Sequence, residues 1–102
     1  MLGWIKKASE NAQRRNIDRS FKLLVDAAAA ADDRLMRSPQ VMPDDVARVT
    51  SLQKSLLMDL IGPVSVDDLR KEYLEPLLSN SSVSEGTKMA VSHVFDSASR
   101  KQ

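Results

Sequence analysis

The sequence predicts a small all-α protein of four helices, built on an antiparallel helical hairpin, with a long first helix that overhangs the hairpin at its N-terminus. Apolar residues recur at intervals of three and four along most of the chain, which is the period of an amphipathic helix. Strand patterns and the Asn-Gly or Asp-Gly turns of β-hairpins are absent from the sequence. About five residues join the first two periodic segments, and short connections favour antiparallel neighbours.

The first helix is predicted by the strongest of these patterns. The alanine run at 27–31 has the highest helix propensity and allows a neighbouring helix to approach closely. Pro39 restricts the residue before it, so we expect this helix to end near Arg37 or Ser38. One face carries apolar residues at spacings of four and three: Ile17, Phe21, Leu24, Ala28, Ala31 and Leu35.

The second helix is predicted to begin after Pro43. Asp44 and Asp45 place negative charge in its first turn, where it suits the helix dipole. Gly62 followed by Pro63 predicts that the helix stops there. Its apolar face consists of Val46, Val49, Leu52, Leu56, Leu57, Leu60 and Ile61.

The third helix is predicted to start at Ser65. This serine is a suitable N-cap, with Asp68 at the third helical position. Proline inside a helix costs about 3 kcal/mol, so we expect the helix to end near Glu75, with a further short turn at 76–78.

The fourth helix is predicted from Ser84 to about Ser99, and with the third it packs across the apolar face of the hairpin. Ser84 is suited to cap it. The predicted core consists of Ile17, Phe21, Leu24, Ala28, Leu35, Val49, Leu52, Leu56, Leu60, Leu69, Tyr73, Val94 and Phe95.

Length and composition restrict the classes of function. With 102 residues, 42% of them hydrophobic, the chain suits one small domain with a core of its own. The absence of cysteine excludes disulfides, thiol catalysis and cysteine-ligated metals. No apolar run approaches the ~20 residues of a membrane span. Lys6 and Lys7 interrupt the start of the chain before the apolar run of a secretory signal, so we expect a cytoplasmic protein.

The sequence offers no residue set suited to catalysis, so we expect a protein that is not an enzyme and holds no cofactor or metal. His93 is the only histidine, and no further metal ligands stand at helical spacing from it. The aspartate pairs at 44–45 and 67–68 lie at predicted helix starts, and the pair at 32–33 has Arg37 as a basic partner. Only three glycines occur, which leaves no phosphate-binding loop.

Residues 1–16 form a predicted basic, amphipathic extension of the first helix, distinct from a helical bundle at 17–102. The whole chain has a formal net charge of +1, but residues 1–22 hold six basic and two acidic side chains, a charge of +4, which leaves −3 for the remainder. The helix is also longer than the hairpin needs, because residues 17–37 already match the length of the second helix. The candidate partner-binding residues are Leu2, Trp4, Ile5, Lys6, Lys7, Arg15, Arg19 and Lys22.

Four interpretations of this extension are open. Trp4 and Ile5 could pack back onto the domain, or two extensions could pair in a homo-oligomer. Trp4 could anchor the chain on another protein, as aromatic residues at interfaces do. The segment could also contact a membrane surface or a nucleic acid, since Arg15, Arg19 and Lys22 share one helical face that could meet phosphates. Its apolar stripe is thin for a membrane-bound helix.

We therefore expect a non-enzymatic protein–protein interaction module, namely a regulator, adaptor or inhibitor that covers a surface of another protein and also associates with itself. One alternative is a nucleic-acid-associated protein that uses the basic extension, although a near-neutral total charge disfavours general nucleic-acid binding. A peripheral membrane-surface protein is the third interpretation and has the least support from the sequence.

Overall fold

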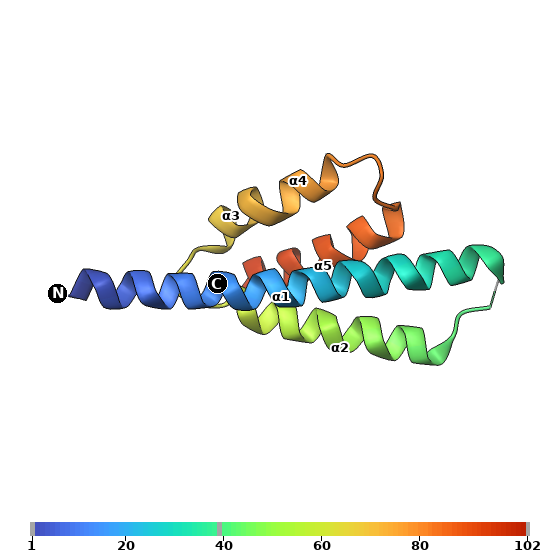
Figure 1. Ribbon diagram of the computed structural model, residues 1–102, viewed down its shortest axis with the longest axis horizontal. Helices are drawn as coiled ribbons and strands as arrows, with labels where there is room; N and C mark the ends of the chain where they lie inside the picture. The colour runs from blue at the N-terminus through green and yellow to red at the C-terminus, as the bar shows by residue number, and fades with distance from the viewer. Residues whose placement is uncertain (1, 39, 102) are drawn as a thin grey trace.

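The computed structural model describes residues 2–38 and 40–101, with side chains from Trp4 onward. Four helices follow one another, and this part of the chain contains no strand. The molecule measures 56 × 26 × 22 Å, and its first helix runs along the whole of the longest dimension (Figure 1). The predicted all-α class, the antiparallel hairpin and the overhanging first helix are confirmed.

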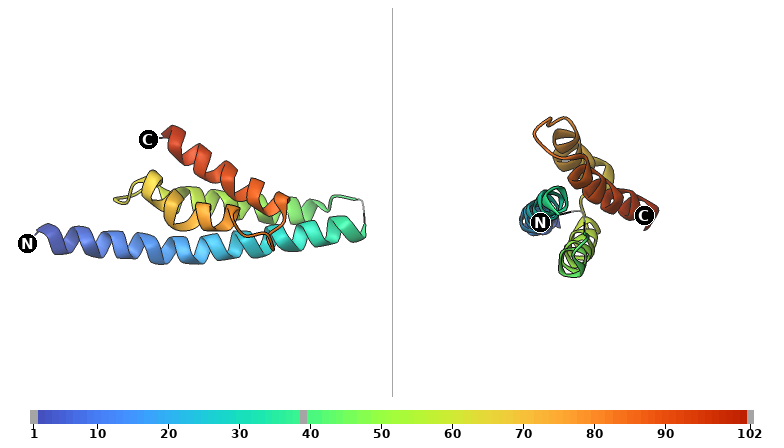
Figure 2. Two further views of the ribbon diagram at one scale, coloured as in Figure 1. Left: turned by 90° about the horizontal axis from the view of Figure 1, so that it is seen from above. Right: turned by 90° about the vertical axis from the view of Figure 1, so that its right-hand side faces the viewer.

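The hairpin is formed by two helices of unequal length. α1 spans Leu2–Arg37 as one unbroken helix of 36 residues, about 54 Å at 1.5 Å per residue. It ends where the sequence predicts, although Pro39 itself lies outside the described residues. α2 spans Pro43–Leu60, has 18 residues and returns antiparallel to α1. The first turns of α1 consequently project beyond the rest of the molecule (Figure 2).

The third helical stretch runs without interruption from 66 to 78 and lies on the side of α1 away from α2 (Figure 1). Its cap is as predicted, because the Ser65 hydroxyl accepts the N–H of Asp68 at 3.2 Å. The stretch has an α-helical start, a π-helical middle and an α-helical end, which are α3 (Val66–Leu69), η1 (Arg70–Leu74) and α4 (Glu75–Leu78).

The helix does not end near Glu75, so that expectation is wrong. In the π-helical turn the N–H of Glu75 bonds to the carbonyl of Arg70, five residues back rather than four. Pro76 follows directly and is exposed. Proline lacks an N–H, and its ring collides with the carbonyl four residues earlier in a regular α-helix. The wider turn before Pro76 relieves that collision, so the chain continues as a helix.

α5 spans Glu85–Lys101 and packs on both helices of the hairpin. Ser84 caps it as predicted, with its hydroxyl accepting the N–H of Thr87 at 3.2 Å. Gly86 lies against Asp32 of α1, and a side chain at this glycine would overlap the Asp32 carboxylate. The glycine therefore lets the start of α5 approach α1 closely.

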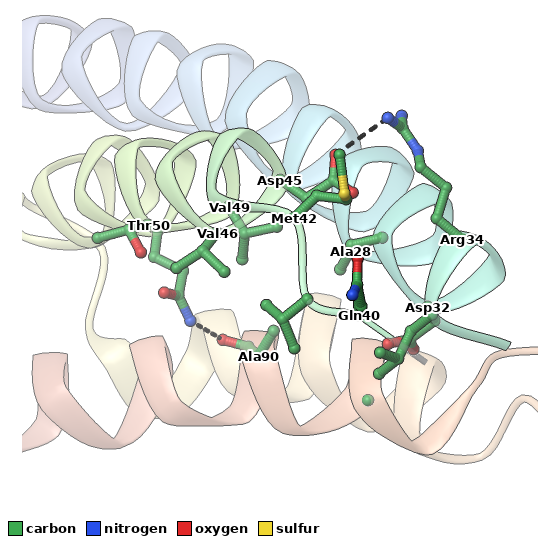
Figure 3. Close-up of a pocket in the computed structure, with 15 residues that line it drawn as sticks. Ala28, Asp32, Arg34, Gln40, Met42, Asp45, Val46, Val49, Thr50 and Ala90 are labelled. Carbon is green, nitrogen blue, oxygen red and sulfur yellow. Dashed lines mark hydrogen bonds and ion pairs between the residues drawn. The ribbon is translucent and has the colours of Figure 1, made fainter. Parts of the chain in front are cut away.

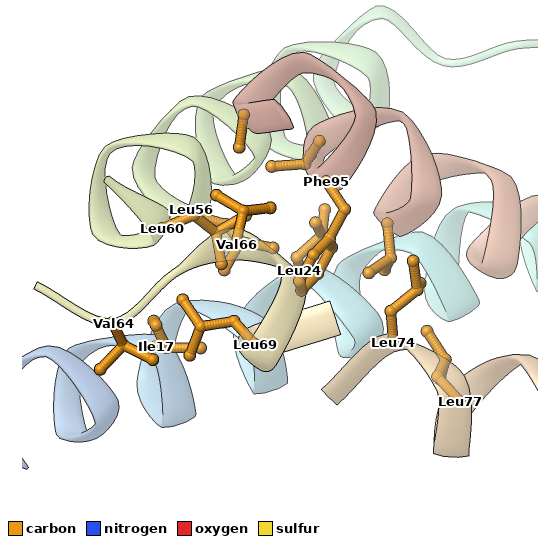
Figure 4. Packing of buried hydrophobic residues seen from close by; sticks show 13 residues of the cluster. Ile17, Leu24, Leu56, Leu60, Val64, Val66, Leu69, Leu74, Leu77 and Phe95 are labelled. Atoms are coloured by element: carbon orange, nitrogen blue, oxygen red, sulfur yellow. The ribbon is translucent and has the colours of Figure 1, made fainter. Parts of the chain in front are cut away.

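The core lies where α1, α2, the third helical stretch and α5 meet (Figure 4). Every predicted core residue except one is buried or partly buried, and all of these but Ala28 belong to this cluster or pack against it. The exception is Leu35, which is 44% exposed because it lies in the last turn of α1, beyond the helices that cover the core. The prediction for Leu35 is therefore wrong. Residues that the predicted core lacked complete the cluster: Val64, Val66, Leu74, Leu77, Val91 and Ala98.

Gln13 fixes the exit of α1 from this bundle. Its side chain is buried, its Nε2 donates to the carbonyl of Asp59 at 3.0 Å, and its Oε1 accepts the N–H of Val64 at 2.8 Å. Gly62 makes room for it, because a Cβ there would lie 2.8 Å from the Gln13 Cδ. One side chain thus fastens α1 to the link between α2 and α3.

Candidate functional site

An apolar groove of about 320 Å³ lies at the end of the hairpin opposite the N-terminus (Figure 3). Small residues on two helices leave this space open, since alanine and glycine cannot fill the gap where α1, α2 and α5 diverge. The residues that make the space are Ala28 and Ala31 of α1 with Gly86 and Ala90 of α5. Val46 and Val49 of α2 line the opposite wall, and Val41 and Met42 of the connecting loop lie at the mouth.

The apolar side chains around the mouth are open to solvent. Leu35, Val41, Met42 and Val46 are between 44% and 64% exposed. They are close together in space because all four line the same groove. A contiguous exposed apolar patch on a small protein typically marks an interaction surface. We therefore take this groove as the candidate site.

Three polar contacts hold the walls of the groove in place. Arg34 of α1 pairs with Asp45 of α2 at 3.2 Å, across the mouth (Figure 3). The Gln53 side chain of α2 donates to the carbonyl of Ala90 in α5 at 3.0 Å. The Ser84 hydroxyl donates to Asp32 and so joins the start of α5 to α1. The groove is therefore built from three helices that are tied to one another in pairs.

The tip of α1, which we define as residues 4–7, is the second exposed apolar feature. Trp4 is 68% exposed and Ile5 is 49% exposed, so neither packs back onto the domain. Lys6 and Lys7 are exposed as well, and no acidic side chain in the described part of the protein pairs with them. The side chain of Leu2, also a predicted contact residue, lies outside the described side chains.

The predicted basic stripe is present on the outward face of α1. Arg15, Arg19 and Lys22 are exposed, and within the described residues none of them forms an ion pair. Trp4 lies on the same face, because its spacing to Arg15 is three helical turns. The face extends about 27 Å from Trp4 to Lys22. It is separate from the groove, which begins at Ala28.

Arg14 differs from these cations because it belongs to a polar cluster that anchors α1 to η1. It forms two hydrogen bonds with the Glu72 carboxylate, at 2.9 and 3.1 Å. This bond to Arg14 lowers the pKa of Glu72. Beside it, the Tyr73 hydroxyl donates to Asp18 at 2.6 Å. Burial first, and then this bond to Asp18, raise the pKa of Tyr73 well above its ordinary value.

The sequence does not reveal the groove, for two physical reasons. The sequence places Leu35 in the predicted core and Val46 on the apolar face of the second helix, because helical periodicity alone does not show where neighbouring helices end. Val41 and Met42 are the residues from which an exposed apolar site could have been predicted, because two large apolar residues in a short loop have no helix face to cover. The alanine run predicted close approach, whereas Ala28 and Ala31 also border an open space.

The remaining chemical candidates are dispersed. His93 is exposed, and Asp96, three residues on, pairs with Arg70 instead at 3.2 Å. Among the residues described, no three histidine or carboxylate side chains gather in a way that could hold a metal ion. Within the same residues, no helix is both long enough and apolar enough to cross a membrane. No protein-family model, curated protein or solved structure matches this chain.

Proposed function

We propose that this chain is a non-enzymatic protein–protein interaction module, a regulator, adaptor or inhibitor, and that its groove is the surface that binds. The observation that carries the proposal is the open apolar mouth formed by Leu35, Val41, Met42 and Val46. Burial of apolar surface is the main driving force of most protein association. Grooves of this kind accept the apolar face of a helix or a single large side chain.

The lining residues and the fixed walls of the groove suit binding rather than catalysis. Its charged lining residues are Asp32, Arg34 and Asp45, and the last two already neutralise each other. The walls are fixed by contacts between helices, so the site needs little rearrangement to receive a partner. A preformed apolar groove with a polar frame is what a recognition surface requires.

Site-specific photo-cross-linking tests the proposal. A photoreactive amino acid placed at Val41, at the mouth, is expected to capture a protein partner in cells that produce the chain. The matched control carries the same group at Met58, which is 75% exposed on α2 but does not line the groove. Equal labelling from both positions, or none from Val41, would contradict a binding role for the groove.

A second candidate function is nucleic-acid binding, and it rests on the outward face of α1. Trp4 shares this face with the cations Arg15, Arg19 and Lys22, although about 16 Å of helix separates it from Arg15. An aromatic residue and unpaired cations on one face suit bases and phosphates. Fluorescence anisotropy with labelled DNA and RNA at two salt concentrations tests it, since phosphate contacts weaken as salt rises. The triple change of Arg15, Arg19 and Lys22 to glutamine should abolish binding. Changing Arg48, Lys54 and Lys71 instead removes the same charge elsewhere and should leave binding intact.

A further inference from the structure

We propose that the groove receives the tip of α1 from a second copy of this chain, so that molecules associate head to tail. This inference rests on the proposed function, because it names the partner of the same groove. Large apolar side chains are exposed both at the tip and around the mouth of the groove, and each of the two surfaces also carries charge without an ion-pair partner among the described residues.

The tip cannot enter the groove of its own molecule. α1 is unbroken from Leu2 to Arg37, and 24 residues separate Trp4 from Ala28, the first residue of the groove. That separation corresponds to about 36 Å along a rigid helix. The N-terminal end of α1 lies at one end of the molecule, and the loop between α1 and α2, which borders the groove, lies at the other (Figure 1). Any tip that occupies the groove belongs to another molecule.

The apolar chemistry of the two surfaces matches. Trp4 is 68% exposed although it is the largest apolar side chain of the protein, and aromatic anchors in pockets dominate the energetics of many interfaces. The groove volume of about 320 Å³ is sufficient for one large side chain. Ala8 follows Trp4 on the same helical face and is small, so the tip can lie close to the walls of the groove.

The charges of the two surfaces are also complementary. Lys7 lies three residues after Trp4 on the same face, and no described carboxylate pairs with it. At the groove, Arg34 and Arg37 are already paired with Asp45 and Asp33. Asp32 lines the groove, and its carboxylate pairs with no cation among the described residues. Lys7 of one copy thus meets an unpaired carboxylate of the next.

The arrangement allows two kinds of assembly. Each chain carries one tip and one groove, so two antiparallel copies can each place a tip in the groove of the other, or each copy can bind only the next in an open series. In both cases we expect association that grows with protein concentration and that weakens as salt screens the lysine and the carboxylate.

A mixing experiment tests this directly. The tip variant carries Trp4→Ala with Ile5→Ala, and the groove variant carries Val46→Arg, which fills the mouth and repels Lys7. Sedimentation velocity should show wild-type chains associating, and each variant alone should associate at least about tenfold more weakly. An equimolar mixture of the two variants should form a heterodimer and stop there, since it offers one intact groove and one intact tip. Thr50→Arg, at an exposed position one helical turn after Val46 in the same wall of the groove, is a second groove variant in case Val46→Arg fails to fold.

The matched control is Met58→Arg, the same kind of change on the same helix outside the groove. It should associate like wild type. If the groove variant associated with itself as strongly as wild type, two tips would be pairing, and the inference would be overturned. If the tip variant did so, two grooves would be pairing, and the inference would be overturned as well. Wild-type chains that stay monomeric up to millimolar concentration would overturn it as well. In that case, capture of a different protein from Val41 would still uphold the proposed function.

Discussion

Replacement of Gln13 by alanine is expected to destabilise the fold far more than a polar residue on a helix surface would suggest. Gln13 lies in the part of α1 that the sequence predicts to be a basic extension of the bundle. In the structure it is only 7% exposed and uses both ends of its amide to hold the α2–α3 link. Alanine keeps the helix but removes both contacts.

The magnitude follows from the two backbone groups left behind. The N–H of Val64 is buried, so its loss of a partner costs about 2 kcal/mol, and the carbonyl of Asp59 is partly buried, so its loss costs about 1 kcal/mol. The total of about 3 kcal/mol corresponds to a decrease in Tm of roughly 10 °C or more for a domain of this size.

Urea unfolding followed by circular dichroism measures this loss. Asn16→Ala is the matched control, because Asn16 is an exposed amide on the same helix, and its change should cost less than about 0.5 kcal/mol. Gly62→Ala extends the test, since its Cβ displaces the Gln13 amide and breaks the same bonds. The two changes should therefore be strongly non-additive in the double variant. Equal stabilities of Gln13→Ala and Asn16→Ala would refute the reasoning.

Three further predictions concern the core and two ionisable groups. Leu24→Ala, at a fully buried position, should cost about 2–5 kcal/mol in urea unfolding, whereas Leu35→Ala should cost less than about 1 kcal/mol; similar losses would contradict the assignment of Leu35 to the surface. Tyr73 is the only tyrosine, so ultraviolet absorbance reports its ionisation directly. The pKa of Tyr73 in the folded protein is raised, so its contribution to folding stability is complete below the ordinary pKa of 10.0 and is lost at higher pH. A phenolate midpoint at pH 10 in the folded protein would show that Tyr73 is neither buried nor bonded to Asp18. The pKa of Glu72 is lowered, so its contribution to folding stability is present above the ordinary pKa of 4.5 and is lost as the pH falls through the folded-state pKa. In thermal unfolding, Glu72→Gln should therefore lose less stability than wild type on acidification. An equal loss in both proteins would exclude the Arg14 contact as the cause.

Most of the fold could be predicted because local signals coincide with helix boundaries. Ser65 and Ser84 cap the helices that they were expected to cap. The failure at Pro76 has a physical cause, since the π-helical turn depends on a shift of hydrogen bonds that no residue type in that stretch signals. The prediction that Leu35 belongs to the core is wrong because a periodic pattern does not reveal that the helices covering the core end before Leu35.

The candidate site was only half predictable. The exposure of Trp4 and Ile5 follows from the excess length of α1, which can be counted in the sequence. The groove depends on how three helices diverge, and that geometry arises from contacts between distant residues such as Gln53 with Ala90 and Ser84 with Asp32. From the sequence, Gly86 is only a residue of low helix propensity, whereas in the structure its lack of a side chain leaves room for the Asp32 carboxylate.

The fluorescence of Trp4 tests most directly whether the tip and the groove form one interface. Trp4 is the only tryptophan, so its emission reports the tip alone. At low concentration the emission should have the long wavelength of an exposed indole, and it should shift to shorter wavelength as the protein concentration rises. The Val46→Arg variant should show no such shift over the same range. Emission that stays at long wavelength at every concentration in wild type, or that shifts equally in the variant, would contradict insertion of the tip into the groove.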